Sequence, residues 1–185
     1  KYHREKGYRM PDQSRLQRLS ETLYWTTMAL SVVLPLIVLY YAGKAVADPG
    51  SLLAQFPGLP ADLIVTRAQA GLVAAVAIAS LLPMLAALRA MTRLFDRYRT
   101  GEVLSHANAM TILTIGRALL AVAAFNIAVP TLHALILSWN APQRVLSIAL
   151  DSGTLGFAIA AGLLTVIGWA MAEAARIKAE NEGFV

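Results

Sequence analysis

Long apolar stretches alternate with short polar ones along the chain, and this pattern predicts four membrane-spanning helices. The apolar stretches cover about residues 22–43, 61–88, 111–137 and 154–174. Each is long enough to cross the hydrocarbon core of a bilayer, which takes about 20 residues of helix. We therefore predict an all-α, polytopic membrane protein with four transmembrane helices in one domain, residues 22–178. The remaining segments are a polar tail at each end (residues 1–21 and 179–185) and a hinge between the second and third spans (residues 89–110).

Prolines, glycines and capping residues indicate where the predicted helices bend or end. Pro35 and Pro83 lie within the first and second spans, where the missing N–H is expected to kink the helix. The second helix is expected to begin near Ala61. Gly101 is placed to end that helix in the left-handed conformation, and Ser105 is placed to cap the start of the third helix.

The second helix changes character beyond Pro83, because a basic stripe joins the apolar one. Arg89, Arg93 and Arg97 recur every four residues, which puts them on one face of a helix. The third helix, residues 106–137, would be about 48 Å long, which is more than the bilayer requires. We therefore expect both helices to extend beyond the membrane and to form a cytoplasmic helical hairpin around the hinge.

The distribution of basic residues predicts the orientation of the protein. Thirteen of the 16 lysines and arginines fall on the side of the tails and the hinge, and three (Lys44, Arg67 and Arg144) fall on the other side. Basic residues concentrate on the cytoplasmic side of membrane proteins. We therefore predict a multi-pass protein of the inner membrane, with the hinge and both termini in the cytoplasm.

Composition narrows the functional classes. Charged residues make up 15% of the chain and hydrophobic residues 57%, and the absence of cysteine excludes disulfides and thiolate metal sites. No phosphate-binding loop, zinc spacing or catalytic motif is present. We expect no enzyme activity, cofactor or metal, and we attribute the net charge of +5 to topology rather than to nucleic-acid binding. His133 and Asn126 are expected to be hydrogen-bonded packing residues.

Two further groups of residues are candidates for pairing and packing within the membrane. Counting about 20 residues inward from the outer ends of the last two spans puts Arg117 and Glu173 at one depth. They either form an ion pair or extend separately into the headgroups, and the sequence leaves both interpretations open. Regularly spaced small residues predict close helix packing at Gly71, Ala75, Gly156 and Gly162.

The hinge carries the candidate contact site, which consists of Arg89, Arg93, Arg97, Tyr98, Arg99 and Glu102. Anionic lipid attracts such clusters by about 1 kcal/mol per basic residue, so lipid contact is the simpler interpretation. Docking of an acidic cytoplasmic protein is the other interpretation, and the two are compatible. Acidic residues interrupt the basic stripe, which weakens a purely lipid-anchoring role.

The hinge also carries a recognisable motif. Residues 94–105 read LFDRYRTGEVLS, and Asn108 and Gly116 follow them. Together with a terminus that contains Glu180, Asn181, Glu182 and Val185, this segment resembles bacterial four-helix membrane proteins of the domain of unknown function 2975 family. The matching hinge residues are Leu94, Phe95, Tyr98, Gly101, Glu102, Leu104, Ser105, Asn108 and Gly116, and an aromatic residue is commoner at position 104. The resemblance covers nearly the whole chain beyond the first tail.

The resemblance implies a function only by association. Members of this family are often encoded beside a small helix-turn-helix regulator, which implies a regulatory pair at the membrane. We therefore expect a non-enzymatic regulatory or interaction protein that holds a cytoplasmic partner at the inner membrane. The alternative is an accessory or assembly subunit of a larger membrane complex. The expected partners are the lipid bilayer and such a protein or complex. The sequence leaves open whether the protein forms a homo-oligomer.

A transporter is a third and less favoured function. It would need a polar cavity at the centre of the membrane, lined by residues such as Thr26, Ser80, Asn126 and Thr165. The spans are instead rich in alanine, valine, leucine and isoleucine at that depth. We therefore expect a closed, alanine-lined interior.

Overall fold

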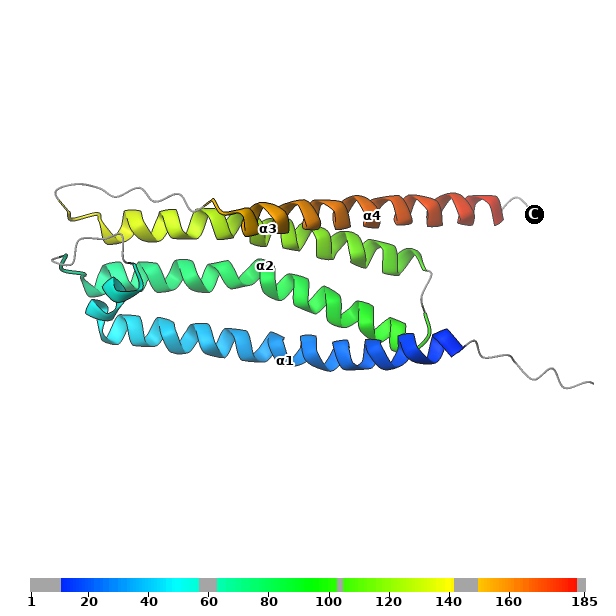
Figure 1. Ribbon diagram of the computed structural model, residues 1–185, viewed down its shortest axis with the longest axis horizontal. Helices are drawn as coiled ribbons and strands as arrows, with labels where there is room; N and C mark the ends of the chain where they lie inside the picture. The colour runs from blue at the N-terminus through cyan, green and yellow to red at the C-terminus, as the bar shows by residue number, and fades with distance from the viewer. Residues whose placement is uncertain (1–10, 57–62, 103–104, 142–149, 183–185) are drawn as a thin grey trace, which may run out of the picture.

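The computed structural model describes residues 11–56, 63–102, 105–141 and 150–182. Within these ranges the chain forms four long α-helices and one 3₁₀-helix: α1 (Pro11–Ala47), η1 (Pro49–Gln55), α2 (Arg67–Arg99), α3 (His106–Leu137) and α4 (Ser152–Glu182) (Figure 1). All four α-helices are long and apolar enough to cross a membrane. The all-α fold with four candidate membrane spans is therefore confirmed.

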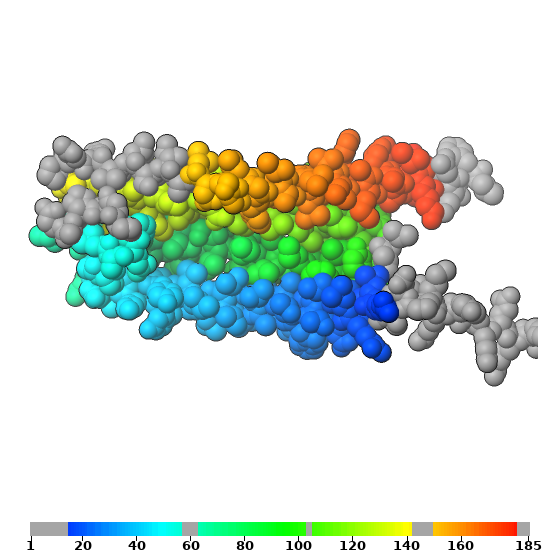
Figure 2. Space-filling model, viewed as in Figure 1, coloured from blue at the N-terminus to red at the C-terminus, as the bar shows by residue number. Residues whose placement is uncertain are grey.

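The four α-helices lie side by side in chain order as an open row (Figure 1). Among the described residues, α1 packs closely on α2, α2 on α3 and α3 on α4, and no other pair of long helices makes close backbone contact. Figure 2 shows α1 and α4 on opposite edges of the row, with α2 and α3 between them. The expected closed interior is therefore not found, because a row leaves two broad faces and many of its large apolar side chains are exposed there.

The two ends of the row differ in which segments they carry. The turn between α2 and α3, the start of α1 and the end of α4 lie at one end, which we call the turn end (Figure 1). The 3₁₀-helix η1 lies at the other end, which we call the η1 end. Here Ala45, Leu52, Ala70, Val73 and Leu137 form a buried apolar cluster that joins α1, η1, α2 and α3.

Helix α2 begins at Arg67, six residues later than the sequence predicts. Thr66 and Gln69 form a capping box, in which the Thr66 hydroxyl oxygen accepts from the Gln69 backbone N–H and Gln69 Oε1 accepts from the Thr66 backbone N–H. Gln69 Nε2 also donates to the carbonyl oxygens of Ile136 and Leu137, at 3.0 and 3.2 Å. One buried side chain therefore hydrogen-bonds to backbone groups at the start of α2 and at the end of α3. These bonds set where α2 begins.

The prolines lie inside continuous helices. Helix α1 runs through Pro35 and α2 runs through Pro83. Figure 1 shows α2 bending near the middle of its length, where Pro83 lies in its residue range. Helix α1 begins at Pro11, so residues 11–21 continue the first helix.

Helices α3 and α4 approach each other most closely at two glycines. A Cβ atom at Gly116 would lie 2.5 Å from the Thr165 hydroxyl oxygen, and one at Gly168 would lie 2.5 Å from the Leu113 backbone nitrogen. A side chain at either position would force the two helices apart, because small residues are what allow helix backbones to approach closely. These contacts also set the register of the antiparallel pair.

Candidate functional site at the turn between α2 and α3

Backbone hydrogen bonds close the turn that follows α2. Gly101 has a φ of 91°, a conformation that residues with a Cβ atom rarely adopt. Its N–H donates to the Tyr98 carbonyl oxygen at 3.1 Å, and the Glu102 N–H donates to the Arg97 carbonyl oxygen at 2.9 Å. These are the two bonds of a Schellman motif, so the prediction that Gly101 ends the helix is confirmed.

Asn108 joins this turn to the start of α3. Its side chain is 0% exposed, its Nδ2 donates to the Glu102 carbonyl oxygen at 2.6 Å, and its Oδ1 accepts from Arg97 Nη1 at 3.3 Å. Its backbone N–H donates to the Ser105 hydroxyl oxygen at 3.2 Å, so the predicted cap at Ser105 is confirmed. A single buried amide therefore connects the end of α2, the turn and the first turn of α3.

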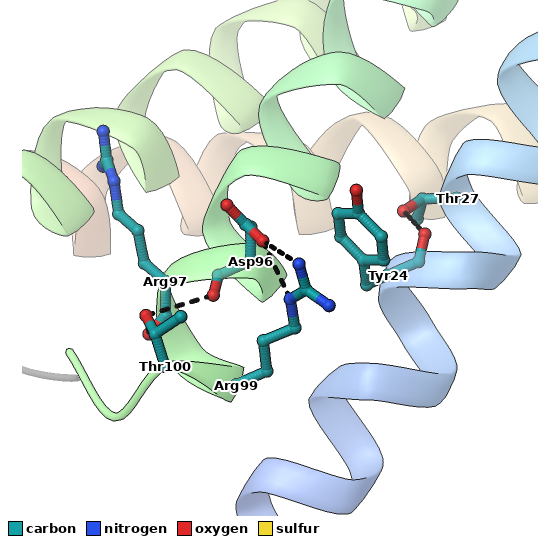
Figure 3. A network of polar contacts seen from close by, with 6 residues as sticks. All are labelled: Tyr24, Thr27, Asp96, Arg97, Arg99 and Thr100. Atoms are coloured by element: carbon teal, nitrogen blue, oxygen red, sulfur yellow. Dashed lines mark hydrogen bonds and ion pairs between the residues drawn. The ribbon is translucent and has the colours of Figure 1, made fainter.

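Arg97 and Arg99 leave α2 in different directions (Figure 3). Arg97 turns toward α3, where its Nη1 also donates to the Thr111 hydroxyl oxygen at 3.0 Å. Arg99 pairs with Asp96, with 2.7 Å between Nη2 and Oδ1, and its guanidinium carbon lies 4.3 Å from the centroid of the Tyr24 ring on α1. The ring and the cation attract each other, so these two arginines hold the end of α2 to both of its neighbours.

Helix α1 contributes polar contacts to the turn end that the sequence analysis missed. The hydroxyl of Thr92 on α2 lies 3.0 Å from that of Thr27 on α1, and Ser20 and Thr27 are both almost fully buried. The signal in the sequence was the spacing of Ser20, Tyr24 and Thr27, which puts these three side chains on one face of the helix.

A shallow depression of about 430 Å³ opens between α1 and the end of α2. Its lining residues are Gln17, Arg18, Glu21, Arg99 and Thr100. The lining carries both signs of charge, so the depression is suited to a partner surface with matched polar groups. Among the described residues, no group of three histidine, aspartate or glutamate side chains is placed to hold a metal ion.

The structure divides the predicted contact residues into two groups. Arg97, Tyr98 and Arg99 are half-buried and engaged within the chain: both arginines make the bonds described above, and Tyr98 packs against a buried apolar cluster between α2 and α3. Arg89, Arg93 and Glu102 have exposed side chains. In the described part of the chain, no ion pair involves these three. Their contact with a partner or lipid stays a prediction.

The predicted ion pair between Arg117 and Glu173 is not formed in the described part of the chain. Glu173 instead pairs with Arg176 one turn along α4, and Arg176 also reaches Glu180. Arg117 is exposed on α3. The structure therefore agrees with the alternative that the two residues point separately to their surroundings.

The register of α3 against α4 explains why the pair does not form. Gly116 lies against Thr165, so its neighbour Arg117 is nearly level with Thr165. Glu173 lies eight residues further along α4, which is about 12 Å along the helix axis. The predicted pairing requires the outer ends of α3 and α4 to lie at the same depth. Helix α4 instead begins part of the way along α3 (Figure 1).

The predicted small-residue faces do not pack within the chain. A Cβ atom at Gly71, Gly156 or Gly162 would meet nothing within 4 Å, and Ala75 is exposed. The close helix contact uses Gly116 and Gly168 instead. A small residue indicates that close approach is allowed, but it does not identify the neighbour.

The polar residues considered for a transporter cavity are spread over all four long helices, one on each. Thr26, Ser80 and Thr165 each donate to a carbonyl oxygen of their own helix. Asn126 is exposed on α3, so it is not the packing residue that the sequence predicted. Hydroxyl groups that bond to their own helix leave little polar surface for a transported solute.

Comparison with known proteins identifies the family of the chain. A family model described as a protein of unknown function (DUF2975) matches residues 55–183. No curated protein and no solved structure matches the chain. The match contains α2, the turn, α3 and α4, and it leaves out α1, so it is shorter than the resemblance seen in the sequence. Because it covers more than half of the chain and includes the turn that Gly101 and Asn108 hold, the protein belongs to the DUF2975 family.

Proposed function

We propose that this is a non-enzymatic protein of the bacterial inner membrane that holds a cytoplasmic protein at the turn end. The observation that carries the proposal is the concentration of interhelical polar contacts at that end, where Arg97, Arg99 and Asn108 hold the backbone around a charged surface. A surface with a fixed backbone loses less conformational entropy when it binds a partner. The turn end also carries most of the basic residues, which supports its placement in the cytoplasm.

The exposed charges indicate the chemistry of the partner. Arg89 and Arg93 lie one turn apart on α2, exposed and without an ion pair among the described residues. They would face acidic side chains, and Arg18 and Glu21 at the depression between α1 and α2 would add contacts of both signs. The association of related proteins with small helix-turn-helix regulators makes such a regulator the candidate partner. Contact of the same arginines with anionic lipid is compatible with this role.

Co-purification tests the proposal. The full chain, extracted in mild detergent, is compared with the double variant Arg89→Gln/Arg93→Gln and with the control Lys44→Gln, which removes an exposed charge at the η1 end. We expect a soluble protein that co-purifies with the wild type and with the control to be lost from the double variant. Recovery of the same protein with the double variant would contradict the proposal.

A second candidate function is that of an accessory subunit of a larger membrane complex. The observation that favours it is that the small-residue faces at Gly71 and Gly162 are unoccupied within the chain. Such faces allow a helix of another protein to pack closely in the membrane. The substitutions Gly71→Leu and Gly162→Leu are then expected to release the protein from a complex on a native gel. Unchanged migration of both variants would rule out this function.

A further inference from the structure

Three exposed arginines lie on the pair formed by α2 and α3, between the turn and the apolar middle of the two helices. Arg89 and Arg93 are on α2, and Arg117 is on α3. In the described part of the chain, none of the three side chains takes part in an ion pair or a hydrogen bond. The proposed docking of a protein involves the two arginines of α2, so it leaves Arg117 without a role.

Arg89 and Arg117 lie at nearly the same level of the row. Arg97 on α2 bonds to Asn108 and Thr111 on α3, and these bonds show how the two antiparallel helices are aligned. Arg89 lies eight residues before Arg97, which is about 12 Å along α2. Arg117 lies six residues after Thr111 and nine after Asn108, which is about 9–14 Å along α3. The two arginines are therefore neighbours on adjacent helices.

The same two arginines lie on one broad face of the row. Met91 on α2 and Leu119 on α3 are half-buried against the same apolar cluster, which Leu164 of α4 also contacts. Two residues along a helix amount to a rotation of about 200°. Arg89 therefore points away from Met91, and Arg117 points away from Leu119. Both arginines thus face the surroundings on the side of the row opposite to that cluster.

An apolar strip continues from the two arginines toward the η1 end. Leu82 and Ile78 lie two and three helical turns before Arg89, and Ala124 and Ala128 lie two and three turns after Arg117. All four of these residues are exposed, and we call them the apolar strip. A positive pair at one end of an exposed apolar strip matches the charge pattern of a lipid, which has a negative headgroup above apolar chains.

The arginines are also at the depth of the headgroups. Arg117 lies 20 residues, about 30 Å, before α3 ends at Leu137. Arg89 lies 22 residues, about 33 Å, after α2 begins at Arg67. The hydrocarbon core of a bilayer is about 30 Å thick. With the η1 end at one boundary of this core, both arginines lie at the other boundary, and the helices continue beyond it to the turn.

We propose that Arg89 and Arg117 bind the phosphate group of one anionic phospholipid, whose acyl chains lie along the apolar strip. Packed helices lie about 8–10 Å apart, so two long side chains at one level can contact the same headgroup. Guanidinium groups bind phosphate oxygens through paired, charge-assisted hydrogen bonds. Arg93, one turn away, adds positive charge, whereas Asp96 on the same face is paired with Arg99. This net positive charge selects a lipid of net negative charge over a zwitterionic one.

An acidic protein is the competing occupant of these arginines. It is disfavoured at Arg117, because a water-soluble protein would have to enter the headgroup layer and cover the apolar strip. The lipid site does not depend on the protein partner proposed above, since Arg117 is part of the lipid site only.

Native mass spectrometry of the full-length protein in detergent tests the proposal. The protein is titrated with phosphatidylglycerol and with phosphatidylcholine that carry the same acyl chains. We expect the wild type to retain one phosphatidylglycerol tightly and phosphatidylcholine weakly. Arg89→Gln and Arg117→Gln should each weaken phosphatidylglycerol binding about fivefold, and the double variant about 25-fold. Arg117→Lys, which keeps the charge, should retain part of the affinity.

Two controls locate the site. Arg67→Gln removes an exposed arginine at the opposite end of α2 and should leave phosphatidylglycerol binding unchanged. Free glycerol phosphate carries the headgroup chemistry without acyl chains, and we expect it not to displace the lipid. The co-purification experiment is repeated with Arg117→Gln, which keeps Arg89 and Arg93, and a soluble partner should be retained.

Several results would overturn the proposal. Equal binding of the two lipids by the wild type, or unchanged binding in Arg117→Gln, would remove the role of the arginine pair. Two tightly held lipids, of which each single variant loses one, would show that the arginines act separately. Displacement by glycerol phosphate would indicate a site for a soluble anion. Loss of a soluble partner from Arg117→Gln with the lipid retained would assign Arg117 to protein docking instead.

Discussion

The two ends of the row are held together by different kinds of interaction. At the turn end, polar side chains connect neighbouring helices: Arg97 bonds to Asn108, Arg99 lies over Tyr24, and Thr92 bonds to Thr27. At the η1 end the helices meet through a buried apolar cluster, and Gln69 is the main polar link described there. Hydrogen bonds specify distances and directions, whereas apolar packing accepts a range of shapes. The turn end is therefore suited to present charges in a fixed arrangement.

The largest expected effect is at the turn end, from Asn108→Leu. The substitution leaves the Glu102 carbonyl oxygen without its buried donor and Arg97 with one acceptor fewer, so we expect a loss of about 3 kcal/mol in the free energy of unfolding. Asn126→Leu is the control, because Asn126 is exposed on the same helix, and it should change stability by about 0.5 kcal/mol or less. Unfolding in detergent measures the stability of both variants. Equal losses of stability would contradict the role assigned to the buried amide of Asn108.

The corresponding test at the η1 end is Gln69→Leu. The Ile136 and Leu137 carbonyl oxygens lose their donor and the capping box is lost, so we expect a loss of about 2 kcal/mol. Gln17→Leu, at an exposed position of α1, serves as the control. If Gln69→Leu is more destabilising than Asn108→Leu, the η1 end depends on polar contacts as much as the turn end does.

Gly101→Ala tests the backbone of the turn itself. The φ of 91° is unfavourable for alanine, so we expect a loss of about 1 kcal/mol. Gly71→Ala is the matched control, because Gly71 lies inside a helix with open space around it, and there alanine should stabilise the helix by about 0.5 kcal/mol. Opposite signs for the two variants are the expected result, and the same sign would contradict the proposed closure of the turn.

Tyr24→Leu and Tyr24→Phe together measure the contact between α1 and Arg99. Phenylalanine keeps an aromatic face for the guanidinium group and leucine does not, so the leucine variant should be less stable by about 0.5 kcal/mol. Hydrogen exchange at the end of α2 should rise in the leucine variant only. Identical exchange in the two variants would mean that the ring does not hold Arg99.

The smallest expected effect is a pH dependence at the start of α4, away from both ends. Asp151 Oδ1 accepts a hydrogen bond from the Thr154 backbone N–H at 2.7 Å, and this bond lowers the pKa of the Asp151 carboxyl group. A lowered pKa in the folded state stabilises the cap above the unfolded pKa, and the effect is lost as the pH falls through the folded pKa. Amide protection in the first turn of α4 should therefore decline on acidification in the wild type and stay constant in Asp151→Asn.

Local features of the sequence predicted much of this structure. The four spans follow from apolar runs, and the caps at Gly101 and Ser105 follow from the conformations that those residue types favour. Each of these features depends on residues close together in the chain. This is why the turn, the centre of the candidate site, could be placed from the sequence alone.

Features that depend on how one helix meets another could not be predicted in the same way. Arg117 and Glu173 fail to pair because a one-residue rise of 1.5 Å accumulates to about 12 Å over the offset between α3 and α4. The glycines that pack α3 against α4 could not be singled out, because Gly71 and Gly116 look alike until the neighbouring helix is known. The start of α2 depends on a bond from Gln69 to the end of α3, 67 residues away.

Single-cysteine labelling tests the central claim, that the turn end faces the cytoplasm, most directly. The chain has no cysteine, so Glu102→Cys at the turn end and Lys44→Cys near the η1 end each introduce one exposed thiol. With a membrane-impermeant maleimide we expect Lys44→Cys to react in intact spheroplasts and Glu102→Cys to react only in inverted membrane vesicles. Reaction of Glu102→Cys in intact spheroplasts would place the turn outside the cytoplasm and contradict the proposed function.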